Sequence, residues 1–138
     1  MAERAKIVVA GGGGFVGSAL RQALAARGAR VVRLVRTEAE GDDVVRWDPV
    51  RGVENVPVLE GAAAVIHLGG ESLASGLWTA ARKRRLRDSR IAGTRTLAET
   101  LARLDARPAT FLTASAVGWY GSRGDEILDE TSARGTGF

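Results

Sequence analysis

Three glycines near the start of the chain have the spacing of a loop that can hold a phosphate group. Gly11, Gly14 and Gly17 follow a short apolar run, residues 7–10, and open an amphipathic segment. There Gly11 permits a tight turn, Gly14 a close approach of backbone to pyrophosphate, and Gly17 the packing of a helix on a strand. An anion would accept hydrogen bonds from free N–H groups at the positive end of the helix dipole. Glycine-rich turns also occur in ordinary loops, but these flanks favour dinucleotide binding over a merely structural turn.

An arginine stands where such loops are followed by the residue that selects the dinucleotide. Residues 30–35 read as a second strand, and Arg36 follows it, with Arg33 nearby and no acidic residue before Glu38. NAD sites place a carboxylate there, about 20 residues beyond the first glycine, to hold the ribose 2′-hydroxyl. A guanidinium instead binds a 2′-phosphate bidentately, so NADP is favoured over NAD as the cofactor. The alternative is that Arg36 is a solvated strand end.

The last strand-like run, residues 109–115, ends in a hydroxyl side chain, that of Ser115. Ligands of open parallel sheets bind outside the carboxyl ends of the strands. Ser115 is therefore a candidate for contact with a ligand. Tyr120 is the only tyrosine and has no lysine after it, so a packed or substrate-lining side chain is favoured over a proton donor.

Other chemistries receive little support from the residue types. His67 is the only histidine and lies inside a strand-like run, residues 62–68, where packing is favoured over catalysis. Because the chain also lacks cysteine, a zinc site is disfavoured. The basic run at 82–87 predicts a solvated helix face, and the lack of interleaved aromatic side chains disfavours nucleic-acid binding.

The elements that position these residues follow from periodicity. Strands are expected at 7–10, 30–35, 44–47, 62–68 and 109–115, with a loop and short helix at 55–61. The first helix should present Phe15, Leu20 and Leu24 inward and end at Gly28. Residues 78–104 predict one long helix, or two with a kink near Gly93, and residues 122–138 predict a loop. The sheet-facing side of the long helix is expected to carry Ile91, Thr94, Leu97, Ala98, Leu101 and Leu104.

Composition limits the class of protein. The 138 residues are enough for one domain with a core, and the absence of cysteine excludes disulfides and thiolate metal sites. No apolar stretch is long enough for a bilayer and no signal-peptide core is visible, so no membrane association and a cytoplasmic location are expected. The formal charge of +4 fits a phosphate-rich cofactor, nucleic acid or a solvated surface, and does not decide between them.

Several motifs in order carry a family resemblance. Residues 10–17, 65–72, 87–94 and 115–121 look like the extended short-chain dehydrogenase/reductases, and the match runs from 6 to 138. More narrowly, the chain resembles the atypical NAD(P)-dependent epimerase-like subgroup. The subgroup's motifs are matched by residues 47–49, 77–90 and 124–130.

This resemblance implies an α/β NAD(P)-binding Rossmann fold, a doubly wound parallel sheet of about five strands in the order 3-2-1-4-5. It also implies roles for single residues, with Ser115 aligned to the hydroxyl that hydrogen-bonds the substrate's carbonyl or hydroxyl in active relatives. The implied cofactor contacts are Gly11, Gly14, Phe15, Val16 and Gly17 at the pyrophosphate, Arg36 at the 2′-phosphate, Leu68 and Gly69 beneath the riboses, and Arg90.

One departure separates this chain from the family pattern. The Tyr-x-x-x-Lys pair that moves the proton is absent, and its expected place is at or beyond Phe138. Residues 1–138 are therefore expected to form one dinucleotide-binding domain, the N-terminal part of a longer protein without its last strands and substrate domain. Such a half should expose apolar surface along its last strand, and either a homo-oligomer or an altered packing is expected to cover it.

Two functions remain open from the sequence. The first is an NADP-binding oxidoreductase or epimerase of an unidentified small molecule, with hydride transfer expected only in the full-length form. The second is a non-catalytic NADP-binding module that senses redox state or scaffolds a partner. Nucleic-acid binding through the basic segment 82–90 is the weakest alternative.

Overall fold

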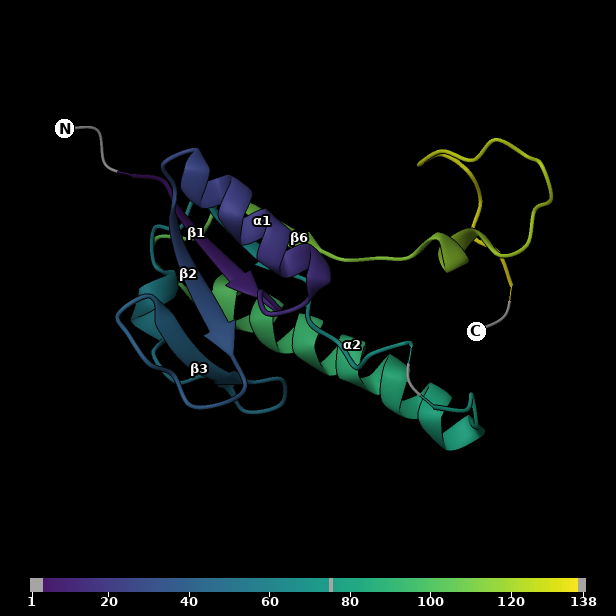
Figure 1. Ribbon diagram of the computed structural model, residues 1–138, viewed down its shortest axis with the longest axis horizontal. Helices are drawn as coiled ribbons and strands as arrows, with labels where there is room; N and C mark the ends of the chain where they lie inside the picture. Colours follow the sequence, from purple (N-terminus) through teal and green to yellow (C-terminus); the bar gives the residue numbers. More distant parts are fainter. Residues whose placement is uncertain (1–3, 75, 137–138) are drawn as a thin grey trace.

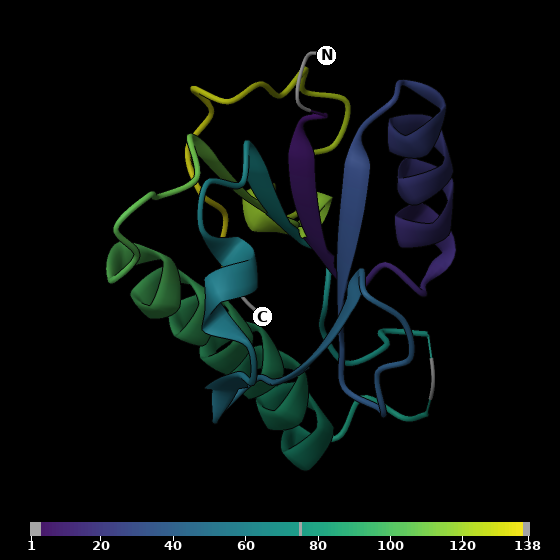
Figure 2. The same cartoon turned by 90° about the vertical axis from the view of Figure 1, so that its left-hand side faces the viewer.

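The computed structural model describes residues 4–74 and 76–136 and shows one open sheet with a helix on each face (Figures 1 and 2). Within this part of the chain the sheet has six strands in the order β4-β3-β2-β1-β5-β6. All neighbouring strands are parallel except β3 and β4. The strands are β1 (Lys6–Ala10), β2 (Arg30–Val35), β3 (Val44–Asp48), β4 (Gly52–Val53), β5 (Ala64–His67) and β6 (Thr110–Thr113).

Two α-helices and two short 3₁₀ helices complete the described elements: α1 (Phe15–Ala26), η1 (Val56–Leu59), α2 (Ala80–Ala102) and η2 (Val117–Tyr120). The end of α1 follows from Gly28, which has a φ of 81° and whose N–H donates to the Ala25 carbonyl at 2.9 Å. Thr79 starts α2 as its N-cap, since its hydroxyl accepts the N–H of Arg82 at 3.2 Å. The expected long helix is therefore a single one, without a break at Gly93.

The five parallel strands confirm the predicted order, and β4 is an addition that the prediction missed. It pairs with β3 antiparallel, Trp47 opposite Val53 and Asp48 opposite Gly52. The turn between them is held by the Asp48 carboxylate, which accepts the N–H groups of Val50 and Arg51, each at 2.8 Å. The result is a β3–β4 hairpin at one edge of the sheet.

The main core lies between the sheet and α2. Alternating residues of the strands, such as Val8 on β1 and Val65 on β5, point to this face and are fully buried. The opposite face of β1 places Val9 toward α1, where it is also fully buried. The core cluster consists of Val8, Ala10, Val32, Leu34, Val45, Trp47, Val53, Leu59, Ala62, Val65, Leu97, Leu101 and Leu104.

Three predicted inward residues point to solvent instead. Phe15 is 96% exposed and Ile91 47% exposed, and Ala98 is also exposed. The reason is the helical repeat of about 100° per residue. Gly17 is the buried residue of α1 and Gly93 is one of the buried residues of α2, and a residue two positions earlier lies about 200° around the helix. Phe15 and Ile91 occupy those positions.

The other end of the sheet is open. β6 is an edge strand whose residues are mostly exposed, and the predicted apolar surface on this strand is confirmed at Leu112, which is 52% exposed, whereas Thr110 and Thr113 are polar. Residues 121–136 form a loop without helix or strand, as predicted, and Figure 1 shows it extending away from the sheet. Positions 137 and 138 of the predicted loop lie outside the described residues. Among the helices described, none is long and apolar enough to cross a membrane.

Candidate functional site

The glycine loop that follows β1 lies directly against the end of β5. Gly11 has a φ of +83°, a left-handed conformation that favours glycine. A Cβ on this residue would lie 2.6 Å from the backbone nitrogen of Gly69 and 2.8 Å from the carbonyl carbon of Leu68. The backbones of the two segments are therefore in direct contact, with no side chain of Gly11 between them. The absence of this side chain also leaves room for a ligand above the loop.

The start of α1 leaves its first N–H groups available to an anion. Gly14 is the N-cap and provides no side-chain cap, and the first turn carries no acidic residue. A Cβ on Gly17 would overlap the carbonyl oxygen of Gly11, so only glycine lets α1 pack on this loop. The side chains of Phe15 and Val16 are exposed, so a role at the pyrophosphate would fall to their backbone.

The loop is also fixed by an arginine that the sequence analysis did not single out. Arg21 on α1 donates from Nε to the carbonyl oxygen of Gly12 at 2.7 Å. Its side chain covers Gly12, where a Cβ would lie 2.9 Å from the Arg21 Cδ atom. The bond occupies the Gly12 carbonyl on the side facing the helix.

A cleft of about 410 Å³ lies at the carboxyl ends of β1, β2, β3 and β5. This is the edge where open α/β sheets bind ligands, and the volume falls within the usual range for ligand pockets. Its lining comprises Gly11, Gly12, Gly13, Gly14, Leu34, Val35, Arg36, Thr37, Trp47, Pro49, His67, Leu68, Gly69, Gly70, Glu71 and Ser89.

The cleft brings together five of the predicted cofactor residues: Gly11, Gly14, Arg36, Leu68 and Gly69. Gly17 lies just behind the loop, and the lining does not include Phe15, Val16, Arg90 or Ser115. Sequence reasoning gave no ligand role to Thr37, Trp47, Pro49, Glu71 and Ser89, although all but Thr37 lie in the motifs that carry the family resemblance. Thr37 and the Trp-Asp-Pro segment at 47–49 follow strands that end at this edge, and that position was the available signal.

His67 forms part of the floor of the cleft and is only 4% exposed, in agreement with the predicted packing role. Its ring meets Trp47 edge-on, with centroids 5.6 Å apart and planes at 88°. Neither ring nitrogen has a hydrogen-bond partner among the described residues. Burial lowers the pKa of His67 below the usual 6.5, because the charged form loses its water, so the imidazole is neutral at pH 7.

The wall formed by the loop after β5 is anchored to α2. Arg82 is only 7% exposed, which corrects the predicted solvated face at this position, and it donates to the Ser72 carbonyl at 2.5 Å and to Glu71 at 3.4 Å. The neighbouring arginines Arg84 and Arg85 are exposed, as expected. The anchoring side chains face the loop because a helix repeat of 3.6 residues aligns positions 82, 86, 89 and 93.

Arg90 makes two further bonds to this anchor. Its guanidinium donates to the Glu71 carbonyl at 3.3 Å and to the Leu86 carbonyl at 3.1 Å. The Glu71 N–H donates to the Ser89 hydroxyl at 3.2 Å. A Cβ on Gly70 would lie 3.1 Å from the Arg90 guanidinium carbon, so Arg90 lies directly behind the cleft wall.

Ser115 emerges at the same edge of the sheet as the cleft. The N–H of Ala114 donates to the His67 carbonyl at 2.9 Å, which extends the β5–β6 pairing to the residue before Ser115. The Ser115 side chain is exposed, and Tyr120 is half-buried in η2. Among the described residues, no group of three or more His, Cys, Asp or Glu side chains could hold a metal ion.

The fold and the cleft define an α/β protein of the NAD(P)-binding Rossmann class. Residues 7–136 match the model of the NAD dependent epimerase/dehydratase family, and the chain belongs to this family. The predicted family assignment is thereby confirmed.

Relatives and solved structures agree with this assignment. Epimerase family protein Mb2239 of Mycobacterium bovis is 40% identical over 134 residues, 97% of this chain and 44% of the relative. The nucleoside-diphosphate sugar epimerase from Corynebacterium glutamicum has a TM-score of 0.80 at 36% identity, over 99% of this chain and 28% of that one. Human SDR39U1 (isoform 2), solved with NADPH, has a TM-score of 0.78 at 26% identity, over 94% and 42%. The chain thus spans less than half the length of these proteins.

Proposed function

We propose that this chain is the NADP-binding part of an oxidoreductase or epimerase. The observation that carries the proposal is Arg36 on the wall of a cleft whose floor is the glycine loop of a Rossmann fold. A guanidinium at the end of β2 attracts a 2′-phosphate, whereas the carboxylate typical of NAD sites would repel it. The NADPH in the human relative's structure supports the same choice.

In this proposal the cofactor lies along the carboxyl edge of the sheet. Backbone N–H groups of Phe15, Val16 and Gly17 bind the pyrophosphate at the positive end of α1, whereas the Gly14 N–H donates to the Gly11 carbonyl at 3.3 Å and shapes the loop around it. Leu68 and Gly69 form the surface beneath the riboses, and Arg90 acts from behind the wall through its bonds to the loop. The dinucleotide supplies hydride chemistry when bound.

Ser115 is proposed to orient the substrate oxygen by a hydrogen bond. It lies beyond the carboxyl end of β6, next to the strand that ends in His67, and its side chain is exposed to a ligand. The substrate is proposed to be a small molecule with a hydroxyl or carbonyl at the reacting carbon. Turnover is expected of the full-length protein, in line with the sugar epimerase of C. glutamicum.

A non-catalytic NADP-binding module is the second candidate. Within residues 1–138 the lysines are Lys6 and Lys83, so Tyr120 has no lysine one helical turn after it. Without a lysine to lower its pKa, a tyrosine is a poor proton carrier near neutral pH. Such a module would bind the dinucleotide without converting a substrate.

One titration tests cofactor binding. Arg36→Glu is expected to lose NADPH binding and to keep NADH binding, because the carboxylate repels the 2′-phosphate and accepts the 2′-hydroxyl. Calorimetry with both dinucleotides measures this. A folded wild-type protein that binds neither would exclude both candidates.

A turnover assay then separates the enzyme from the module. The full-length protein is assayed with NADPH or NADP and a panel of carbonyl compounds and nucleotide sugars, beside its Ser115→Ala variant. Turnover that falls about 10²-fold or more in the variant supports the enzyme. Tight NADP binding with no turnover in the full-length protein favours the module.

We also propose a cytoplasmic location and self-association through the open edge of β6. The absence of cysteine fits a reducing compartment. The exposed backbone edge and the 52% exposed Leu112 can pair with a second copy of the chain. Analytical ultracentrifugation tests the association, and a clean monomer at high concentration contradicts it.

A further inference from the structure

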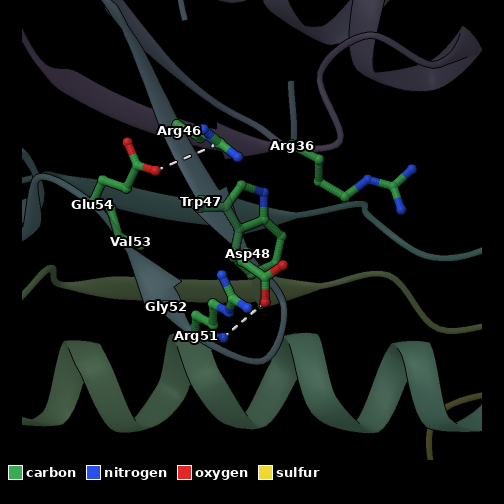
Figure 3. Close-up of a pocket in the computed structure, with 8 residues that line it drawn as sticks. All are labelled: Arg36, Arg46, Trp47, Asp48, Arg51, Gly52, Val53 and Glu54. Atoms are coloured by element: carbon green, nitrogen blue, oxygen red, sulfur yellow. Dashed lines mark hydrogen bonds and ion pairs between the residues drawn. The ribbon is translucent and has the colours of Figure 1, made fainter. Parts of the chain in front are cut away.

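A smaller hollow of about 180 Å³ adjoins the dinucleotide cleft (Figure 3). It lies between the end of β2 and the β3–β4 hairpin. Arg36 and Trp47 line both spaces, so the hollow and the cleft share a wall. The lining of the hollow comprises Arg36, Arg46, Trp47, Asp48, Arg51, Gly52, Val53 and Glu54.

The charges around the hollow favour an anion. Arg46 and Glu54 form an ion pair at 3.4 Å, which balances one positive charge. Asp48 accepts the two N–H groups of its own turn, and the bond from the Arg51 N–H is the main cause that lowers the pKa of this carboxyl, so it stays charged. Three guanidinium groups against two carboxylates leave a net positive charge.

Two of the three guanidinium groups have hydrogen-bonding capacity to spare. Within residues 4–74 and 76–136, the side chains of Arg36 and Arg51 make no hydrogen bond or ion pair, although Arg51 attracts Asp48 electrostatically. Figure 3 shows Arg46 and Arg51 reaching in from opposite sides of Trp47. Each guanidinium can therefore turn its donors to an incoming group.

We propose that this hollow is the subsite for the 2′-phosphate of NADP and that Arg51 is a specificity-determining residue beside Arg36. The inference rests on the proposed function, because it extends the binding of NADP at the same cleft. A phosphate monoester carries a charge of roughly −1.5 to −2 at neutral pH and accepts bidentate bonds from arginine. The 2′-hydroxyl of NAD has no charge, so these arginines discriminate between the two dinucleotides.

The hairpin holds Arg51 in place before any ligand binds. The antiparallel pair of Asp48 and Gly52 closes the turn, and the Thr96 hydroxyl on α2 donates to the Pro49 carbonyl at 2.6 Å. Binding then requires the ordering of only the arginine side chain, not of its backbone, which preserves affinity. Arg46 is a weaker contributor because Glu54 competes for its guanidinium.

The experiment compares adenosine 2′,5′-bisphosphate with adenosine 5′-monophosphate, and NADPH with NADH, by calorimetry. Arg51→Gln is expected to bind the bisphosphate and NADPH about ten-fold more weakly, with the other two ligands unchanged. Arg51→Lys keeps the charge but not the bidentate geometry, and an intermediate loss is expected. The matched control is Arg84→Gln, an exposed arginine of α2 outside both linings.

The outcomes separate this inference from the proposed function. If Arg51→Gln binds all four ligands as the wild type does while Arg36→Gln loses the preference, the hollow is not the subsite and the proposed function stands. If the folded wild type binds no dinucleotide, the proposed function fails and the subsite falls with it. A wild type that binds NADH and NADPH equally overturns the subsite while leaving dinucleotide binding intact. Unchanged thermal unfolding of each variant shows that the fold is retained.

Discussion

A Cβ atom on Gly11 would lie 2.6 Å from the backbone nitrogen of Gly69, closer than real side chains approach an amide. The two residues follow the neighbouring parallel strands β1 and β5, which pair up to Ala10 and His67. The contact therefore sets how closely the glycine loop sits over the centre of the sheet. Position 11 tolerates glycine alone on two independent grounds, the contact and the positive φ.

The first prediction concerns this contact. Gly11→Ala should lower the free energy of unfolding by about 2–4 kcal/mol, since strain at positive φ adds to overlap with the β5 end. Dinucleotide binding should be lost with it. Gly13→Ala is the matched control, because a Cβ there meets nothing within 4 Å. Urea unfolding of both variants measures the difference, and equal stabilities would contradict the contact.

The second prediction follows from the buried histidine. The folded protein lowers the pKa of His67 below 6.5, so the unfolded chain binds more protons as the pH falls below that value. The free energy of unfolding should be constant above about pH 7.5 and then decrease by up to about 1.4 kcal/mol per pH unit, until the folded-state pKa is passed. Unfolding titrations from about pH 8 to about pH 5 measure the slope.

The His67→Leu variant is the control for this pH dependence. It removes the titrating group and should therefore flatten the curve in that window, whatever its own stability. Asp48 does not interfere there, because its pKa is lowered from 3.8 and its contribution changes only in stronger acid. An identical slope in wild type and variant would assign the pH dependence to other groups.

The third prediction is a coupling between His67 and Gly93. A Cβ on Gly93 would lie 3.1 Å from the His67 Nε2 atom and 3.4 Å from a Trp47 ring carbon. Alanine is favoured over glycine in a helix by about 1 kcal/mol, but in the wild type the imidazole crowds the added methyl. Gly93→Ala should therefore be more favourable in a His67→Ala background, by at least about 1 kcal/mol.

Chemical unfolding of the double-mutant cycle measures this coupling. Ala98→Gly, on the solvent side of α2, serves as the control and should add to His67→Ala within about 0.5 kcal/mol. If the free-energy changes of Gly93→Ala and His67→Ala were also additive, the added methyl would not be crowded by the imidazole. In that case α2 moves away from β5 at no cost in free energy of unfolding.

The fourth prediction concerns the anchor of the cleft wall. Arg82→Met keeps the apolar stem but removes the donors to the Ser72 carbonyl and Glu71, and should cost about 1–3 kcal/mol of folding free energy. Hydrogen exchange should accelerate at the Glu71 amide, because this N–H donates to the Ser89 hydroxyl on α2 only while the loop is held in place. The exposed Arg84→Met is the control, and equal exchange in both variants would show that the wall does not depend on Arg82.

Much of the fold could be predicted because the strands carry their own signal. Val32 and Leu34 alternate with less buried neighbours, and Gly28 marks the end of α1, so the positions of the strands and of this helix end followed from the sequence. The parallel arrangement and the strand order followed from the family resemblance. The strand β4 could not be predicted, because two residues contain no alternation. Its pairing depends on a turn closed by the Asp48 side chain.

The site residues that could be predicted are those whose residue type suits a ligand contact and which directly follow a strand. Gly11 and Arg36 line the cleft, as their positions after β1 and β2 indicated. Glu71 and Ser89 reach it only because α2 packs along the loop after β5, which no local pattern reveals. Arg82 was misjudged for the same reason, since its burial depends on Ser72 and Glu71 in another segment.

Trp47, whose ring meets that of His67 edge-on in the wall of the cleft, is placed to report on ligand binding by its fluorescence. Trp47 lines both the cleft and the adjoining hollow and is only 4% exposed, whereas Trp78 and Trp119 are 51% and 54% exposed. Reduced nicotinamide absorbs where tryptophan emits, so energy transfer from Trp47 would report the arrival of NADPH without any label. Trp78→Phe and Trp119→Phe together would leave Trp47 as the single tryptophan of the chain, so that its emission reports on this cleft alone.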